Sequence, residues 1–517
     1  MRKQIELAIV PEQLSNPLYH KNIIARSLNV DPSEITGINL LKRSLDARKS
    51  KIFFRCRFEV FIDEIPEQHH FDFPFKNVTK SPDVIIAGAG PAGMFAALKC
   101  IELGLKPIII ERGKKVNERK HDIAHILREG IINPDSNYCF GEGGAGTFSD
   151  GKLYTRSTKR GDVNRILQLL YMHGAEPDIL ADSHPHIGTD KLPAIIAAIR
   201  QTIEEFGGEF HFENRINDIK IKNDTFESVT TAQGNEFGGS AFILATGHSA
   251  RDIFFLLEKK NILIEPSPFA AGFRIEHPQQ LIDEIQYHRK NRGRYLPAAT
   301  YSLAGQFGGR GVFSFCMCPG GTIVDASTSQ DELVLNGMSN SRRNLPFANS
   351  GIVATVNETD YKSFGFEGPL SGIRFQKMLE KYAFVAGGSN HFAPAQRMTD
   401  FFENKLSSGI GTSSLRQGTQ LSPLHEIFPP FIVTSVKEAF KEFDKKMKGF
   451  YTSEAAVFAV ESRTSSPVRI PRDAATLEHL QIGNFFPCGE GSGYAGGIVS
   501  SAIDGENAAE AVARKIL

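Results

Sequence analysis

A glycine-rich turn directly after a short apolar run constrains the fold of this chain more than any other feature. Residues 82–93 read Pro-Asp-Val-Ile-Ile-Ala-Gly-Ala-Gly-Pro-Ala-Gly, with Gly88, Gly90 and Gly93 in a G-x-G-x-x-G pattern. Gly88 suits a tight turn, Gly90 leaves room for a pyrophosphate, and Gly93 lets the next helix pack closely on its strand. The pattern predicts a buried strand over 84–87 and a helix whose N-terminus faces the phosphates of a dinucleotide.

A second apolar run completes a βαβ unit of the nucleotide-binding type. Residues 107–110 end at Glu111, where a carboxylate would accept hydrogen bonds from an adenosine ribose, and Arg112 is assigned to the same site. A lone glycine pattern also occurs in ordinary loops. Here the strand, the helix and the terminal acid follow one another in order, so we expect a dinucleotide site.

The length and the net charge of the chain limit the classes of protein to which it can belong. A chain of 517 residues, 41% of them hydrophobic, can form two or three domains with separate cores. Lys plus Arg equal Asp plus Glu at 59 each, so no net charge favours nucleic acid or an anionic membrane. No run of about 18 apolar residues occurs, and the first residues contain no uninterrupted apolar segment. We therefore expect a soluble, cytoplasmic protein without nucleic-acid or membrane partners.

The six cysteines show neither a disulfide framework nor the spacing of a metal site. Only Cys316 and Cys318 are close together, in a C-x-C arrangement. An iron–sulfur centre or a structural zinc needs four clustered ligands, so no metal is predicted. The pair is either redox-active or consists of two small buried apolar residues, as free cysteines usually are.

The chain divides into three predicted domains. Residues 1–80 alternate strand and helix patterns and predict a small α+β domain of βαββ-like order. Residues 81–250 and 465–517 share glycine-rich patterns and predict one discontinuous, Rossmann-like domain. Residues 251–464, rich in Phe, Gly and Pro, predict an inserted α+β substrate or cap domain. The predicted fold class is therefore α/β.

Two local predictions concern the first part of the Rossmann-like domain. Thr189 or Asp190 is expected to cap a helix over 192–206. Short apolar segments between residues 209 and 231 predict a meander that closes on a strand at 240–247.

Three segments occur in the order used by glutathione-reductase-type FAD flavoproteins, which this chain resembles. They are Gly88–Gly93 with Glu111, then Ala245–Gly247, then Cys488–Glu490. The resemblance implies FAD as cofactor, with its pyrophosphate at the glycine turn and its ribose at Glu111. It also implies contacts to the adenosine half from Ala245, Thr246 and Gly247, and to the ribityl chain from Gly489 and Glu490.

The same resemblance assigns two further segments to the flavin ring. Gly496, Gly497 and Ile498 would lie near the pyrimidine edge, where a helix dipole stabilises negative charge on the reduced ring. Residues 141–152 would lie against the ring, since Gly144 and Gly146 let backbone approach it and Lys152 adds positive charge. The alternative for 141–152 is an exposed glycine loop with a surface lysine. Related reductases carry a C-x-x-x-x-C pair here, whereas this chain has Cys139 alone, which disfavours disulfide-reductase chemistry.

Further sequence segments extend the resemblance to most of the chain. The segments at 141–153, 186–190, 245–252, 316–321, 336–339 and 461–469 together resemble a bacterial family of uncharacterised FAD-dependent dehydrogenases. That resemblance implies the cofactor and the fold more firmly than the reaction.

Candidate catalytic groups come from titratable residues outside the glycine motifs. Histidine titrates near neutrality, so His184, His186 and His248 could transfer protons, although each is more often structural. The arginines before the last glycine motif could bind a carboxylate or phosphate, or could form salt bridges at a domain boundary. The candidates are Lys152, His184, His186, His248, Arg463, Arg469, Arg472 and, as a residue beside the flavin, Tyr494.

The leading functional prediction is a FAD-dependent oxidoreductase, a dehydrogenase or reductase that transfers hydride through flavin N5 to or from a small-molecule substrate. No second G-x-G-x-x-G follows a strand, since the cluster at 305–311 lacks that context, so NAD(P)H would bind only transiently. An NAD(P)H-using flavin monooxygenase is the nearest alternative. A non-catalytic or RNA-associated flavoprotein is the alternative of another class, although no RNA-binding motif is evident.

Overall fold

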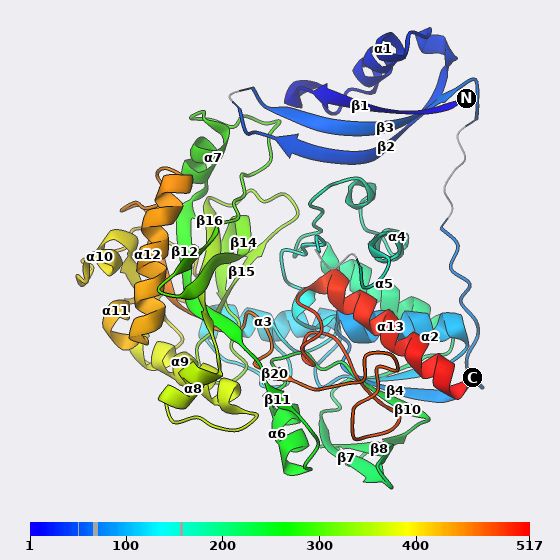
Figure 1. Cartoon of the computed structure of the whole chain (residues 1–517), viewed down its shortest axis with the longest axis vertical. Coiled ribbons are helices and arrows are strands. Elements are labelled where there is room, and N and C mark those ends of the chain that lie inside the picture. Colours follow the sequence, from blue (N-terminus) through cyan, green and yellow to red (C-terminus); the bar gives the residue numbers. More distant parts are fainter. Residues whose placement is uncertain (50, 66–70, 156–158) are drawn as a thin grey trace.

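A five-stranded parallel sheet underlies the glycine-rich part of the chain (Figure 1). The computed structural model describes residues 1–49, 51–65, 71–155 and 159–517. Every neighbouring pair in this sheet is parallel, and the four strands other than the half-buried edge strand at Glu209–His211 are almost completely buried, as their apolar runs require. In spatial order the strands are β21 (Phe485–Pro487), β10 (Ala241–Leu244), β4 (Asp83–Ala87), β5 (Lys106–Ile110) and β6 (Glu209–His211).

The last helix of the chain packs against the helix of the first glycine motif. Figure 1 shows α13 (Ile498–Ile516) beside α2 (Pro91–Leu103). The approach is close, because a Cβ atom at Gly505 would lie 2.1 Å from the Ala92 carbonyl oxygen. Two segments far apart in the sequence thus meet on one face of the sheet. The other helices of this region are α3 (Val116–Glu129), α4 (Val163–Met172), α5 (Leu192–Glu205) and α6 (Arg251–Lys259).

The predicted meander is wrong in which strands pair with one another. Only β7 (Ile216–Lys222), β8 (Thr225–Thr231) and β9 (Glu236–Gly238) form a separate antiparallel sheet. The flanking strands β6 and β10 belong to the parallel sheet instead. Strand β10 is wholly apolar, so it can be buried on both of its faces.

The predicted helix cap at residues 189–190 is also wrong. Lys191 precedes α5, and the Asp190 carboxylate accepts hydrogen bonds from the backbone N–H and hydroxyl of Ser341 at 2.7 Å each.

The region from 265 to 464 is built on an eight-stranded, mainly antiparallel sheet. Its spatial order is β13 (Ala304–Phe307), β14 (Arg310–Asp325), β16 (Phe347–Val356), β12 (Phe269–Pro278), β19 (Ala456–Glu461), β17 (Ala393–Arg397) and β18 (Thr419–Leu421), with β15 (Leu335–Ser339) paired to β14. The short strands β11 (Glu265–Pro266) and β20 (Val468–Arg469) pair beside it. Strand β14 contains register shifts between Phe315 and Gly321, which become important at the site.

Helices and aromatic side chains cover this larger sheet. Buried phenylalanines such as Phe273, Phe401 and Phe440 pack between the sheet and its helices. The helices are α7 (Gln279–Tyr287), α8 (Glu358–Ser363), α9 (Ser371–Ala386), α10 (Met398–Glu403), α11 (Leu424–Ile427) and α12 (Pro430–Lys446). None of the helices among the described residues combines the length and apolarity that a membrane span needs.

The N-terminal region forms a three-stranded antiparallel sheet with one helix, at the top of Figure 1. Its elements are β1 (Arg2–Ile9), α1 (Pro17–Leu28), β2 (Ile35–Asp46) and β3 (Phe53–Ile62), with β3 in the centre. Arg43 links it to the nucleotide region through ion pairs with Asp178 at 2.9 Å and Asp182 at 2.6 Å. Short 3-10 helices occur at Pro11–Gln13, Pro32–Glu34, Gly144–Gly146 and Pro177–Leu180.

Candidate functional site

A cavity of about 410 Å³ collects most of the residues that the sequence assigned to FAD. It lies where the parallel sheet meets the larger antiparallel sheet. The assigned residues that line it are Gly88, Gly90, Glu111, Arg112, Gly144, Gly146, Lys152, Ala245, Thr246, Gly247, Glu490, Gly496, Gly497 and Ile498.

Gly93 and Gly489, the other two assigned residues, lie behind the lining. A Cβ atom at Gly93 would be 1.9 Å from the Gly88 carbonyl oxygen, and one at Gly489 would be 2.8 Å from the Ala92 Cβ atom. Both glycines therefore act on the site by allowing close packing beneath it.

The lining consists of two chemically different walls. The backbone wall contains the glycine segments at 88–90, 144–146, 247 and 496–497. Ionisable side chains also line the cavity, and we call five of them, Lys152, His248, Cys316, Arg463 and Glu490, the side-chain wall.

The helices α2 and α13 both begin at the backbone wall. Gly90 is the N-cap of α2 and Gly497 is the N-cap of α13, and both line the cavity. The free N–H groups and the dipole of a helix N-terminus favour anions. The cavity therefore offers two positive helix ends, one for phosphate and one for a second electron-rich group.

The Glu111 carboxylate fixes the shape of the backbone wall. It is 5% exposed and accepts hydrogen bonds from the backbone N–H groups of Ala89 at 2.9 Å, Gly113 at 2.8 Å and Gly141 at 3.0 Å. One side chain thus joins the first glycine turn to the loop that begins at Gly141. A ligand hydroxyl can use the lone pairs that remain toward the cavity.

Arg112 shapes the wall and is held by carboxylates. Its guanidinium pairs with Asp135 at 2.9 Å and Asp252 at 2.8 Å, and it lies 4.2 Å from the centroid of the Phe140 ring. Its charge is therefore largely compensated before any ligand binds.

Two buried charged residues that sequence reasoning missed hold the glycine loop from beneath. Arg119 is completely buried and donates to the carbonyl oxygens of Asn137, Tyr138 and Glu142 at 2.8–2.9 Å. The Glu142 carboxylate pairs with Arg200 at 2.7 Å. The sequence gives no local signal for either role, because the contacts join separate segments.

Lys152 lies among acidic and sulfur atoms. Its Nζ atom is 3.0 Å from the buried Asp150 carboxylate and 3.7 Å from the Cys318 sulfur. Asp150 also pairs with Arg343 at 2.6 Å, and the two cations hold the pKa of Asp150 at about 2 despite its burial. Lys152 is thus a charged group of the cavity and not a free surface lysine.

His248 and Glu490 face each other across 3.7 Å, from imidazole Nε2 to carboxylate Oε1. Burial, with Arg463 and Arg251 nearby, lowers the pKa of His248 to about 3, and burial raises the pKa of Glu490 to about 7. Near neutral pH the imidazole is therefore uncharged, and Glu490 is the group of this pair that gains or loses a proton.

Arg463 reaches the cavity from a buried ion-pair cluster. It pairs with Glu380 at 2.8 Å, and Arg251 pairs with the same carboxylate at 2.7 Å and with Glu332 at 3.1 Å. Glu380 is completely buried, and the two guanidinium groups lower its pKa well below the usual range. Arg463 therefore forms the salt bridge that the sequence left open and also lines the cavity, whereas binding of a carboxylate or phosphate by its guanidinium stays a prediction.

The other catalytic candidates lie outside the cavity lining. His184 is exposed against Tyr154, and the His186 Nε2 atom lies 3.2 Å from the Ser341 carbonyl oxygen. Arg472 pairs with Asp504 at 2.6 Å, which fastens the segment before Gly489 to α13. Tyr494 lies between the guanidinium groups of Arg469 and Arg472, at 4.9 and 3.7 Å from its ring centroid.

The residues present fit FAD. Cβ atoms at Gly247, Gly496 and Gly497 would meet no heavy atom within 4 Å, and one at Gly90 only a glycine Cα atom at 3.9 Å, so the backbone wall leaves a cradle. Glycines and helix N-termini suit a flat, anionic dinucleotide.

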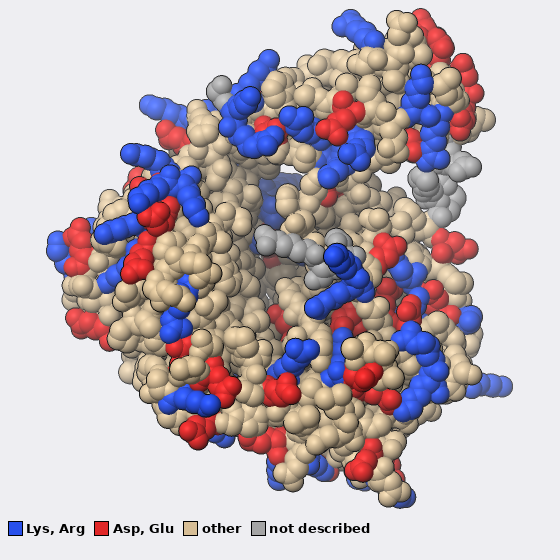
Figure 2. Space-filling view, in the orientation of Figure 1, with Lys and Arg blue, Asp and Glu red and all other residues tan. Residues whose placement is uncertain are grey.

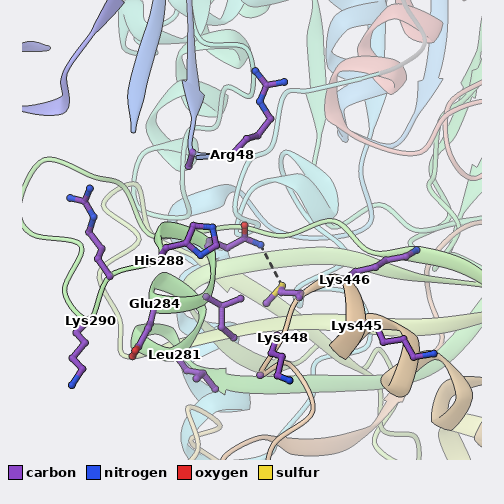
Figure 3. Close-up of a pocket in the computed structure, with 14 residues that line it drawn as sticks. Arg48, Leu281, Glu284, His288, Lys290, Lys445, Lys446 and Lys448 are labelled. Atoms are coloured by element: carbon purple, nitrogen blue, oxygen red, sulfur yellow. Dashed lines mark hydrogen bonds between the residues drawn. The ribbon is translucent and has the colours of Figure 1, made fainter. Parts of the chain in front are cut away.

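A second cavity, of about 970 Å³, lies near the N-terminal sheet and is strongly basic. Figure 3 shows His288 and Lys290 following α7, Lys445, Lys446 and Lys448 at the end of α12, and Arg48 beyond β2. Lys and Arg side chains also gather on this part of the molecular face in Figure 2. The cations are exposed, whereas the charges of the first cavity are mostly paired and buried.

Comparisons with known proteins agree with a flavin site. Residues 268–464 match the family "FAD-dependent protein, C-terminal domain-like", residues 83–121 the family "FAD binding domain", and residues 1–61 a domain of unknown function. An uncharacterised protein from Clostridium beijerinckii (strain ATCC 51743 / NCIMB 8052) is 38% identical over 514 residues, or 95% of each chain. FAD is thus the cofactor.

Two solved structures show a distant similarity. The halogenase PltM is 12% identical with a TM-score of 0.36, over 84% of this chain and 69% of that one. The open conformation of a flavocytochrome c3 fumarate reductase is 12% identical with a TM-score of 0.35, over 87% and 83%. These similarities are too weak to bear on the reaction.

Proposed function

The chain belongs to the family of the Clostridium beijerinckii protein, and from this premise we propose that it is a FAD-dependent oxidoreductase of the dehydrogenase or reductase type. In this proposal the parallel-sheet region is a Rossmann-like domain, and flavin N5 exchanges a hydride with a small-molecule substrate. NAD(P)H is proposed to bind transiently, without a domain of its own.

The division of the cavity into two walls is the observation that carries this proposal. A cofactor that served only to stabilise the fold would need the backbone wall alone. The second wall instead places an amine, a thiol, a guanidinium, an imidazole and a carboxyl around one space. Such a concentration of ionisable groups with shifted pKa values is typical of a reaction site.

The side-chain wall can hold and move a proton at defined atoms. Glu490 Oε1, with a pKa of about 7, is suited to take up or release the proton that accompanies hydride transfer. The His248 imidazole, whose Nε2 atom lies 3.7 Å away, is uncharged near neutral pH and therefore adds no positive charge beside that carboxyl. Arg463 and Lys152 supply fixed positive charge, which favours an anionic substrate.

Rapid mixing of the purified holoprotein with NADH or NADPH in the absence of oxygen tests the proposal. We expect the flavin absorbance to bleach with at least one donor and to recover slowly when oxygen is admitted. Fast recovery would favour the monooxygenase alternative. A protein that binds no flavin, or a bound flavin that no nicotinamide or organic donor reduces, would contradict the proposal.

A further inference from the structure

Two cysteines lie at the side-chain wall, and the proposed hydride chemistry does not use them. Cys316 lines the cavity and is partly exposed to it, whereas Cys318 is completely buried directly behind it. The register of β14 shifts between Phe315 and Cys318, and Cys316 has a φ of 46°. In a regular strand the two side chains would lie on one face but well apart, whereas in this irregular segment the Cys318 thiol turns back to the Cys316 backbone and donates to its carbonyl oxygen at 3.3 Å.

Two cations hold this thiol pair. The Cys318 sulfur lies 3.7 Å from Lys152 Nζ and 3.9 Å from Arg274 Nη2, and Arg274 also donates to the Cys316 carbonyl oxygen at 2.8 Å. Arg274 is completely buried, so its charge acts through a medium with little water. Two cations therefore face the thiol pair and favour negative charge on one of its sulfurs.

The acidic groups around the pair are few and already engaged. Asp150 pairs with Lys152, Glu461 pairs with Arg274, and the Glu490 carboxyl lies nearby across the cavity. The hydrogen bond from Cys318 and the two cations lower the pKa of Cys316 well below its ordinary value, and the proton that the pair shares raises the pKa of Cys318. Of the two sulfurs, Cys316 is therefore the one that loses its proton more readily.

The other buried cysteines show what a purely structural thiol looks like in this chain. Cys100 is completely buried among apolar side chains, and burial alone raises its pKa to about 12. Cys318 is equally buried but has two cations within 4 Å of its sulfur, from Lys152 and Arg274. Packing requirements do not account for that difference.

We propose that Cys316 and Cys318 form a dithiol–disulfide couple that exchanges an electron pair with the bound FAD. In the oxidising direction, the Cys316 thiolate and the Cys318 thiol form an S–S bond, FAD takes the two electrons, and the Cys318 proton passes to the reduced flavin. The reverse step breaks the S–S bond and regenerates thiolate, thiol and oxidised FAD. The proposal rests on the proposed function, because the flavin is its redox partner.

An anaerobic reductive titration of the holoprotein tests this couple. The protein is first treated with the thiol oxidant diamide, freed of it, and titrated with dithionite while the flavin absorbance is recorded. We expect the natural protein to take up two more electrons per FAD than the Cys316→Ser variant takes up. Cys139→Ser, which removes another cysteine of the cavity lining, should behave like the natural protein.

Peptide mass spectrometry gives a readout that needs neither turnover nor a substituted protein. After diamide, the peptide with both cysteines should resist alkylation and be lighter by two hydrogens, and after reduction both sulfurs should alkylate. In the reduced protein, iodoacetamide should modify Cys316 faster than Cys139 at pH 6, and Lys152→Gln should slow that reaction.

Equal electron uptake by the natural protein and Cys316→Ser would overturn the couple, as would a peptide that stays a dithiol after diamide. These results are distinct from a failure of the proposed function, which would show as a flavin that no hydride donor reduces. Dithionite reduces the flavin in either case, so the thiols are tested independently.

Discussion

The two walls of the FAD cavity are held in different ways. The backbone wall is made of glycines and helix N-termini, fixed from behind by Glu111, Arg119 and Glu142. The side-chain wall is made of ionisable groups fixed by buried ion pairs, chiefly Arg463 with Glu380 and Arg274 with Glu461. Close backbone packing therefore determines the form of the backbone wall, and buried ion pairs determine the form of the side-chain wall. We infer that the first binds the cofactor and that the second determines what the cofactor does.

The largest effect is expected from breaking the support of the side-chain wall. Glu380→Gln removes the anion between Arg251 and Arg463 and should lower the free energy of unfolding by about 3–5 kcal/mol, measured by urea denaturation. The control is Glu358→Gln, whose pair with Lys362 is more than half exposed and should contribute less than about 1 kcal/mol. Similar losses in the two variants would contradict a charge-supported wall.

Overpacking the layer behind the backbone wall is expected to cost somewhat less. In Gly93→Ala the added methyl group would lie 1.9 Å from the Gly88 carbonyl oxygen, which should cost about 1–3 kcal/mol and weaken FAD binding. Gly496→Ala is the control for stability, because its methyl group meets no atom of the described protein within 4 Å. Urea denaturation of the apoproteins compares the two. An unchanged Gly93→Ala protein would show that the turn is less tightly packed than described.

Neutralising one cation of the side-chain wall should alter reactivity more than stability. Lys152→Gln removes the charge nearest the thiol pair and should raise the pKa of Cys316, because a nearby cation favours the thiolate form. The pH dependence of iodoacetamide alkylation measures this shift. Lys191→Gln, at a surface ion pair, is the control and should leave the alkylation profile unchanged.

The smallest effect concerns the pH dependence of the apoprotein. Folding raises the pKa of Glu490 from 4.5 to about 7, so the folded protein holds a proton that the unfolded chain releases. The contribution of Glu490 to stability is therefore complete below pH 4.5 and is lost as the pH rises to about 7. Glu490→Gln should flatten this decline by on the order of 1 kcal/mol, because solvent reaches part of the side chain. An identical decline in the variant would exclude Glu490 as its source.

The sequence predicts the backbone wall far better than the side-chain wall. Gly88, Gly90 and Gly93 are close together, and their spacing follows directly from the geometry of a strand, a turn and a helix. The FAD prediction from these motifs is confirmed by the family matches, whereas the individual contacts to FAD stay predictions.

The side-chain wall depends on contacts between distant segments. Arg274 meets Glu461 and the Cys316 carbonyl only because β12 pairs with β19 and β14 lies one strand beyond β16. A contact of this kind leaves no periodic pattern in the local amino-acid sequence. The sequence therefore left Cys316 and Cys318 as two open alternatives, and it assigned no role to Arg274, Glu461 or Glu380.

A crystal structure of the FAD complex tests the two-wall account most directly. We predict the pyrophosphate at the N-terminus of α2, beside Gly90, and the flavin ring between the 144–146 segment and Cys316. A flavin ring turned away from β14, with no ring atom near the Cys316 sulfur, would contradict the assignment of binding to one wall and chemistry to the other.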